Sequence, residues 1–208
     1  MTLKPWIENG QESHEQENNL WANLSLQPKA EAITEKTAFD LKNHIDNYPD
    51  FPKPWIQFKD ISPILMSEEA MSYVLEKLQA YSIHADIVAL MDARWFLFRI
   101  PWKPAIMIRK KGKLPWETTD VIYQKEYDAD VMEIQKTAIK PWQKVVIVDD
   151  LLATGWTMNA AATLIEKAWG EVIGLFNVVQ LNDSYCVAER KKYNLDRYDI
   201  NSLAHYDE

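Results

Sequence analysis

The chain has 208 residues, with 31 acidic against 23 basic side chains and a formal net charge of −8. This balance lacks the positive footprint that binds nucleic acid or an anionic membrane surface, so neither partner is expected. The one cysteine, Cys186, excludes an intrachain disulfide, and no apolar run is long enough to span a membrane. These features favour a protein of the reducing cytoplasm.

The pattern along the chain indicates one folded domain. Residues 1–29 are polar and acidic and are expected to form a weakly structured extension, which leaves residues 30–208 for the domain. Apolar spacing predicts helices over residues 30–48, 67–81 and 158–169. Strands are expected at residues 56–58, 87–91, 106–108, 118–122, 131–134, 145–148 and 172–179. This alternation predicts an α/β fold with a mainly parallel twisted sheet, whereas residues 182–208 have no clear pattern.

The stretch Val145–Thr157, which reads VVIVDDLLATGWT, carries the strongest functional signal. Its first four residues predict a short buried strand, and Asp149 and Asp150 follow directly. Carboxylates at this end of a strand lie where open α/β sheets bind ligands, and they accept hydrogen bonds from sugar hydroxyls. The next turn leads into a helix, so its N–H groups and hydroxyls are suited to a phosphate. The turn consists of Ala153, Thr154, Gly155, Trp156 and Thr157.

From the residues alone this pattern has two interpretations, because an apolar strand followed by two acids also occurs in phosphate-accepting signalling domains. The segment resembles the loop of type I phosphoribosyltransferases that binds 5-phosphoribosyl-1-pyrophosphate (PRPP). That family's pattern ends in Thr-Gly-Gly-Thr, and Trp156 stands at its second glycine. The resemblance covers about residues 39–181. It implies the family's fold, a single-domain sheet flanked by helices with a small hood, and a homodimer.

The same resemblance implies roles for the residues of the central stretch. Asp149 and Asp150 would meet the ribose hydroxyls, and the turn from Ala153 to Thr157 would meet the 5-phosphate. Mg²⁺ would arrive on PRPP and lie near the two acids, with no direct metal site on the protein.

The segment Asp50–Ile61, DFPKPWIQFKDI, resembles the adenine-side segment of adenine phosphoribosyltransferases. The resemblance implies that Phe58 stacks on the purine and that the backbone of Gln57 and Lys59 reads the base edge. Without the resemblance, Phe58 is better explained as a core aromatic. The implied reaction belongs to purine salvage: adenine and PRPP give AMP and pyrophosphate. Two alternatives remain open, a related enzyme for another purine and a PRPP- or nucleotide-binding protein without turnover.

Four basic residues are candidates for binding pyrophosphate by the same resemblance. Arg94 lies in DARWFLF, which resembles the family's acid-Ala-Arg-Gly-Phe turn. Arg109, Lys110 and Lys113 lie in the basic turn RKKGKLP, which resembles a pyrophosphate-contacting segment. A run of charges is more usually a solvated surface. A planar guanidinium, however, suits bidentate contact with phosphate oxygens.

Glu126 and Tyr127 fall where the family has a mobile flap that carries a Glu-Tyr pair. A closing flap would exclude water from a reactive sugar cation. Together with Arg94, these two residues are therefore the candidate catalytic residues, with Glu126 handling a proton or stabilising the cation.

The chain has nine tryptophans and only five glycines. Tryptophan stands at several positions where the family commonly has glycine, and this repetition indicates either engineering or an altered reading of glycine codons. Because glycine supplies positive φ and close backbone approach, we expect strain and impaired activity, and weaker PRPP binding through Trp156. The clear positions are Trp55, Trp95, Trp116, Trp142, Trp156 and Trp169, with Trp102, Leu90 and Arg99 as further candidates.

Overall fold

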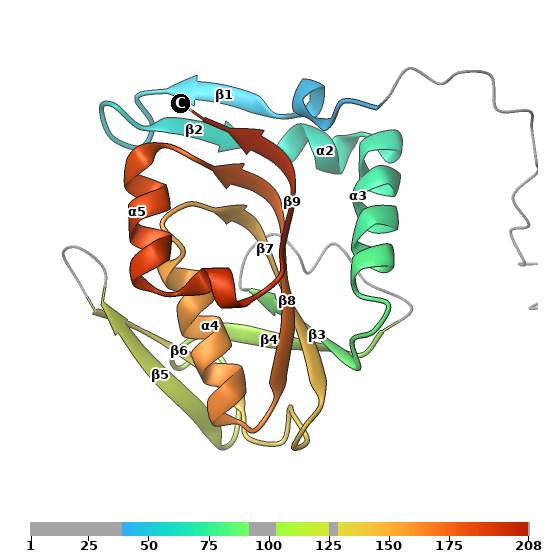
Figure 1. The fold of residues 1–208 in the computed structure, drawn as a ribbon, viewed down its shortest axis with the longest axis vertical. Helices are drawn as coiled ribbons and strands as arrows, with labels where there is room; N and C mark the ends of the chain where they lie inside the picture. The colour runs from blue at the N-terminus through green and yellow to red at the C-terminus, as the bar shows by residue number, and fades with distance from the viewer. Residues whose placement is uncertain (1–38, 92–102, 125–128, 208) are drawn as a thin grey trace, which may run out of the picture. The chain divides into compact units, whose positions relative to one another are not determined.

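A mixed seven-stranded sheet is the largest element of the computed structural model, which describes residues 39–91, 103–124 and 129–207 (Figure 1). The strand order is β5-β6-β4-β3-β7-β8-β9. Strands β4, β3, β7, β8 and β9 pair in parallel, and the β5–β6 hairpin adds antiparallel pairs at one edge. The bounds are β3 (Ile87–Met91), β4 (Ala105–Lys110), β5 (Thr118–Gln124), β6 (Ala129–Gln135), β7 (Lys144–Leu152), β8 (Glu171–Leu181) and β9 (Ile200–Tyr206). The predicted α/β fold with a mainly parallel sheet is confirmed.

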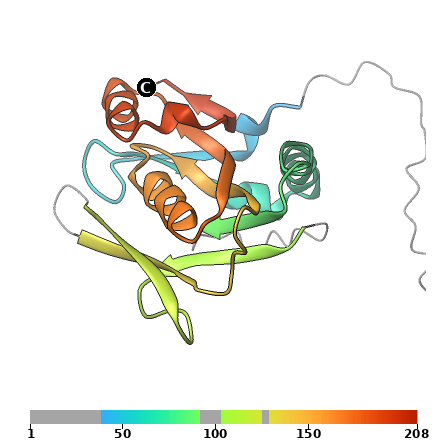
Figure 2. The same cartoon turned by 60° about the horizontal axis from the view of Figure 1, so that its bottom comes forward.

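Strand β7 lies inside the sheet between β3 and β8, as expected for its β-branched run. Residues Val145–Val148 are buried, and the strand continues beyond the prediction to Leu152. The following helix α4 (Trp156–Lys167) turns its alanines and leucine into the core. Figures 1 and 2 place α4 on one face of the sheet and α3 (Glu68–Tyr81) on the other. The site residues that follow β7 are thus held between a buried strand and a packed helix.

The predicted helix over residues 67–81 is confirmed as α3, and Ser67 is its N-cap. The Ser67 hydroxyl accepts a hydrogen bond from the Ala70 N–H at 3.2 Å, which satisfies a free donor of the first turn. The short helix α2 (Ser62–Met66) precedes it. In the described ranges, no helix is long and apolar enough to cross a membrane.

A separate two-stranded sheet, β1 (Asp46–Pro49) with β2 (Gln57–Asp60), corresponds to the expected hood. The prediction of a helix over residues 30–48 is wrong in the part that the structure describes. The 3-10 helix η1 (Leu41–His44) and strand β1 lie there instead. Asp40 caps only a single turn, and residues 46–49 then pair with β2. Strand pairing over a distance in sequence outweighs the weak helical pattern there.

The C-terminal residues, which showed no clear pattern, form helix α5 (Ser184–Lys192), the 3-10 helix η3 (Leu195–Arg197) and strand β9. Asp183 caps α5 by accepting from the backbone N–H groups of Tyr185 and Cys186. Strand β9 extends the parallel sheet beside β8. The signal was weak because β9 buries only Ala204 deeply.

Candidate active site

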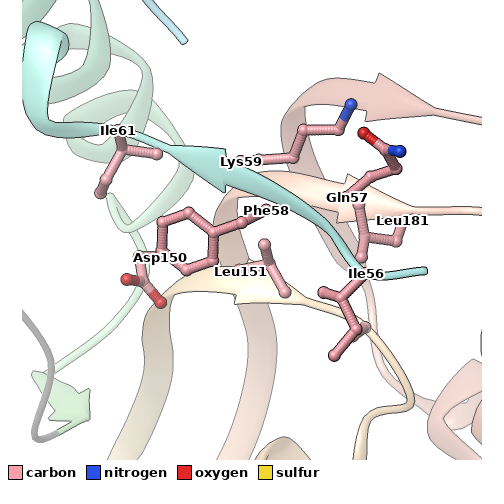
Figure 3. A pocket seen from close by; sticks show the side chains of 9 residues that line it. Ile56, Gln57, Phe58, Lys59, Ile61, Asp150, Leu151 and Leu181 are labelled. Carbon is pink, nitrogen blue, oxygen red and sulfur yellow. The ribbon is translucent and has the colours of Figure 1, made fainter. Parts of the chain in front are cut away.

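A cavity of about 480 Å³ opens where β2 of the small sheet faces the carboxyl end of β7 (Figure 3). Parallel sheets bind ligands at this edge. The wall is mostly apolar, with one carboxylate, which is typical of a pocket for a flat polar ligand. The lining residues are Ile56, Gln57, Phe58, Lys59, Ile61, Asp150, Leu151, Ala153 and Leu181.

Phe58 points into this cavity, toward Leu151 and Asp150, whereas Lys59 points to the opposite face of β2 (Figure 3). The alternation of side chains along a strand causes this arrangement. The Lys59 ammonium donates to Asn47 Oδ1 at 3.0 Å, and Gln57 Oε1 accepts from Asn47 Nδ2 at 3.2 Å. Both polar groups are therefore engaged with β1.

The two acids after the β7 core differ in environment. Asp150 lines the cavity, whereas Asp149 is only 7% exposed and accepts a hydrogen bond from the Asp150 N–H at 2.9 Å. Burial raises the pKa of Asp149, and the neighbouring charge of Asp150 raises it further. A buried acid with a raised pKa beside a cavity marks a candidate functional site.

The turn from Ala153 to Thr157 has the geometry of an anion site. Gly155 takes the left-handed φ of 82° and α4 begins at the next residue, so the first helical turn offers free N–H groups. Ala153, at the start of the turn, lines the cavity. The Thr154 hydroxyl is inaccessible to solvent and has no hydrogen-bond partner among the described residues. A buried hydroxyl of this kind requires a partner that a ligand can supply.

The basic turn after β4 is held by a buried acid, Glu133 of β6. Its carboxylate accepts from the N–H groups of Lys113 and Leu114, each at 3.0 Å, and from the Thr118 hydroxyl. Burial favours a raised pKa for Glu133, but these hydrogen bonds outweigh it and the pKa is lowered. The backbone of the turn is thus anchored to β6.

The three predicted pyrophosphate ligands of this turn differ in their surroundings. The ammonium group of Lys110 pairs with Asp130 Oδ2 at 3.1 Å, and Lys113 is exposed. Arg109 is half-buried in the last part of β4. Arg94, Glu126 and Tyr127 lie outside the described residues, as do Trp95, Arg99 and Trp102.

Trp156 is the first residue of α4, and its indole stacks on Tyr123 of β5, with ring centroids 5.0 Å apart. The indole lines a second hollow with Asn159 and Thr163, on the side of α4 that faces the hairpin. The left-handed position of the turn is Gly155, so the expectation that Trp156 forbids the required φ is wrong. Trp156 packs instead as part of the α4–β5 contact.

Four other tryptophans do have left-handed backbone. The φ angles of Trp55, Trp116, Trp142 and Trp169 lie between 65° and 73°, and their side chains are 67% to 92% exposed. The expectation of glycine-like turns at these four positions is confirmed. Leu90 differs, because it lies buried in extended strand β3.

Sequence reasoning missed Arg190 of α5, which is buried and contacts the turn Ala153–Thr157. Its guanidinium donates to the Ala153 carbonyl at 2.6 Å. The only sequence signal was a cluster of basic residues in a segment without a clear pattern. Leu181 was also missed as a cavity residue because it lies at the very end of β8.

The chain is similar in sequence to proteins of a known family. Residues 104–206 match the family model described as the phosphoribosyl transferase domain. The adenine phosphoribosyltransferase of Clostridium acetobutylicum is 42% identical over 174 residues, which cover 80% of this chain and 98% of that protein. The chain belongs to the adenine phosphoribosyltransferase family. It is therefore an enzyme of the pentosyltransferase class.

Solved structures of adenine phosphoribosyltransferases have the same fold. The enzyme of Thermoanaerobacter pseudethanolicus matches with a TM-score of 0.71 and 42% identity, covering 80% of this chain and 98% of the other. The enzyme of Saccharomyces cerevisiae matches with a TM-score of 0.70 and 30% identity over 78% of this chain and 96% of the other. That structure holds adenine and an imino-altritol bisphosphate.

Proposed function

We propose that this chain transfers the phosphoribosyl group of PRPP to adenine, giving AMP and pyrophosphate. One observation carries the proposal: in a chain of this family, an aromatic residue, a carboxylate and the phosphate-type turn line one cavity, through Phe58, Asp150 and Ala153. In the reaction a ring nitrogen of adenine forms the bond to C1 of the ribose, pyrophosphate leaves with the electron pair of the broken bond, and the nitrogen loses its proton.

The three parts of the product AMP would meet three parts of the cavity. Adenine would stack on Phe58, with the β2 backbone at Gln57 and Lys59 against its edge. The ribose hydroxyls would donate to Asp150 and, after a small shift, to Asp149. The 5-phosphate would accept hydrogen bonds from the turn that begins at Ala153. This assignment leaves pyrophosphate near the ends of β3 and β4.

The candidate pyrophosphate ligands are Arg109, Lys110, Lys113 and Arg94. Mg²⁺ would accompany PRPP, and the donor set at the end of β7 suits it, since Asp149 and Asp150 offer the hard oxygen ligands that Mg²⁺ prefers. When bound, the ion would help to neutralise charge on the pyrophosphate. Glu126 and Tyr127 would act from the flap, with Glu126 near the base. The cation-like transition state would then be stabilised mainly by positioned charges.

We propose that the protein forms a homodimer, as the family resemblance implies, and that it works in the cytoplasm. Light scattering at assay concentration tests the dimer, and a monomeric mass would contradict it.

Base specificity is the part of the proposal most open to test. A PRPP-dependent assay against adenine, hypoxanthine, guanine and xanthine, with each nucleotide product followed directly, should give AMP only. Product from another base would favour a related purine enzyme. Binding of PRPP without any nucleotide product would favour a binding protein without turnover.

Replacing Phe58 with alanine should weaken adenine binding by about tenfold to a hundredfold, since base stacking on an aromatic contributes about 1–3 kcal/mol. The dissociation constant of adenine, measured by calorimetry, checks this. Tyr48→Ala is the control, because Tyr48 is an exposed aromatic of β1 that is not part of the cavity wall. Equal losses in the two variants would contradict a stacking role for Phe58.

Replacing Thr154 with valine should weaken binding of ribose 5-phosphate by about tenfold, which corresponds to about 1.4 kcal/mol. The reason is that the buried hydroxyl has no partner in the described residues and is free to serve the phosphate. The free protein should melt no lower than before, since valine keeps the shape and removes an unsatisfied group. Thr163→Val is the control, because its hydroxyl donates to the Asn159 carbonyl within α4. Unchanged affinity in Thr154→Val would argue against the phosphate site.

A further inference from the structure

Arg190 is a buried cation that joins two walls of the active site. Its side chain is only 7% exposed. One guanidinium nitrogen, Nη1, donates to the carbonyls of Ala153 and Leu181, each at 2.6 Å, and Nη2 donates to Asn182 Oδ1 at 3.1 Å. Ala153 opens the phosphate turn, and Leu181 closes the far side of the cavity. A single side chain therefore fixes the distance between the turn and the end of β8.

The acceptors of these three bonds are all neutral oxygens. Burial lowers the pKa of Arg190, and the nearby Cys186, Asp183 and Asp196 partly offset this. A phosphate held by the turn would add a further negative charge at this end of the cavity.

The same side chain also packs against the left-handed residue of the turn. A Cβ atom at Gly155 would lie 3.0 Å from Cγ of Arg190 and 2.4 Å from Cδ1 of Leu195. The aliphatic part of Arg190 and Leu195 of η3 therefore pack against Gly155, while the guanidinium donates to the Ala153 carbonyl. With the carbonyl held on this side, the N–H groups that follow it are directed toward the cavity.

We propose that Arg190 is a positioning residue for the 5-phosphate: it orients the turn Ala153–Thr157 and adds positive charge behind it. The inference rests on the proposed function, because that function names the phosphate. We therefore expect that loss of Arg190 lowers the affinity for ligands that carry the phosphate and leaves the affinity for ligands without it nearly unchanged.

The test compares AMP with adenine, which differ by the ribose phosphate. In Arg190→Gln the dissociation constant of AMP should rise by about tenfold or more, while that of adenine changes less than about twofold. Arg190→Lys keeps the charge and guards against loss of the fold, but one ammonium group cannot reproduce the two-sided bonding of a guanidinium, so only partial recovery is expected. Arg197→Gln is the control, since Arg197 pairs with Glu166 at the surface.

The outcomes separate this inference from the proposed function. A merely structural role would weaken AMP and adenine equally in Arg190→Gln, and that result, or an unchanged affinity for AMP, would overturn the inference alone. If the unsubstituted chain binds neither AMP nor adenine, the proposed function fails and the inference fails with it.

A second inference rests on the backbone and is independent of the first. Trp55, Trp116, Trp142 and Trp169 all have left-handed φ and exposed side chains. Large residues rarely adopt this conformation, whereas glycine does so freely. Four such cases in a chain with nine tryptophans and five glycines point to one cause. We infer that the codons for these four positions are read as glycine in the organism that carries the gene.

Tandem mass spectrometry of the protein purified from that organism tests this inference directly. Peptides that cover the four positions should contain glycine. The gene should also use one codon at all four, distinct from the ordinary tryptophan codon. Peptides with tryptophan at these positions would overturn the inference.

Discussion

Replacing Trp55, Trp116, Trp142 and Trp169 together with glycine should raise the free energy of unfolding by about 3 kcal/mol. A residue with a Cβ atom costs about 1–2 kcal/mol in the left-handed region, and the greater unfolded-state freedom of glycine offsets about 0.5–1 kcal/mol of each gain. The four side chains are largely exposed, so little packing is lost. The melting temperature should rise by about 10 °C, as measured by calorimetry.

Trp156→Gly is the matched control for these substitutions. Trp156 lies outside the left-handed region and stacks on Tyr123, so the same change should lower the free energy of unfolding, by about 1 kcal/mol. The sequence pattern predicts that PRPP binds more tightly once the Trp156 indole is removed. Because the indole packs toward the β5–β6 hairpin, we instead expect the PRPP affinity of Trp156→Gly to change less than about threefold. A fall in stability on replacing the four left-handed tryptophans would contradict the strain account.

The second large effect concerns the acids at the end of β7. Asp149→Asn with Asp150→Asn should weaken PRPP binding by about tenfold or more, because the ribose would lose its carboxylate acceptors. The free protein should be no less stable at neutral pH. The pKa of Asp149 is raised in the folded state, so its stabilising contribution is present at low pH and is lost as the pH rises through that raised value. Asparagine cannot ionise, so the variant does not lose this stability as the pH rises.

Thermal melts and PRPP titrations at acidic and neutral pH check both parts. The unsubstituted protein should lose stability relative to the variant as the pH rises. Asp120→Asn controls for a general change in charge, because Asp120 pairs with Lys111 at 2.6 Å on the surface. An unaltered PRPP affinity in the double variant would remove the acids from the ribose site.

The sequence predicted the elements in which local pattern and tertiary environment agree. The β-branched run Val145–Val148 is suited to a strand buried on both faces, and the structure buries it. Ser67 is a strong N-cap before a regular apolar face, and α3 begins directly after it. The cavity was partly predictable, since Phe58 and Asp150 each lie in a stretch with a strong family pattern and meet in space.

Other features depend on contacts between distant residues. Strand β1 exists because it pairs with β2, and its own sequence carries little strand signal. Arg190 reaches a carbonyl 37 positions earlier in the chain, and no local pattern could predict that bond. The left-handed tryptophans show the opposite case, in which the fold keeps a backbone conformation that the side chain disfavours.

A crystal structure of the protein with AMP would show where each part of the product binds. We expect the phosphate to accept hydrogen bonds from the backbone of the turn Ala153–Thr157, the ribose to contact Asp150, and adenine to lie against Phe58. AMP bound away from this cavity, or with its adenine in the turn, would contradict the account.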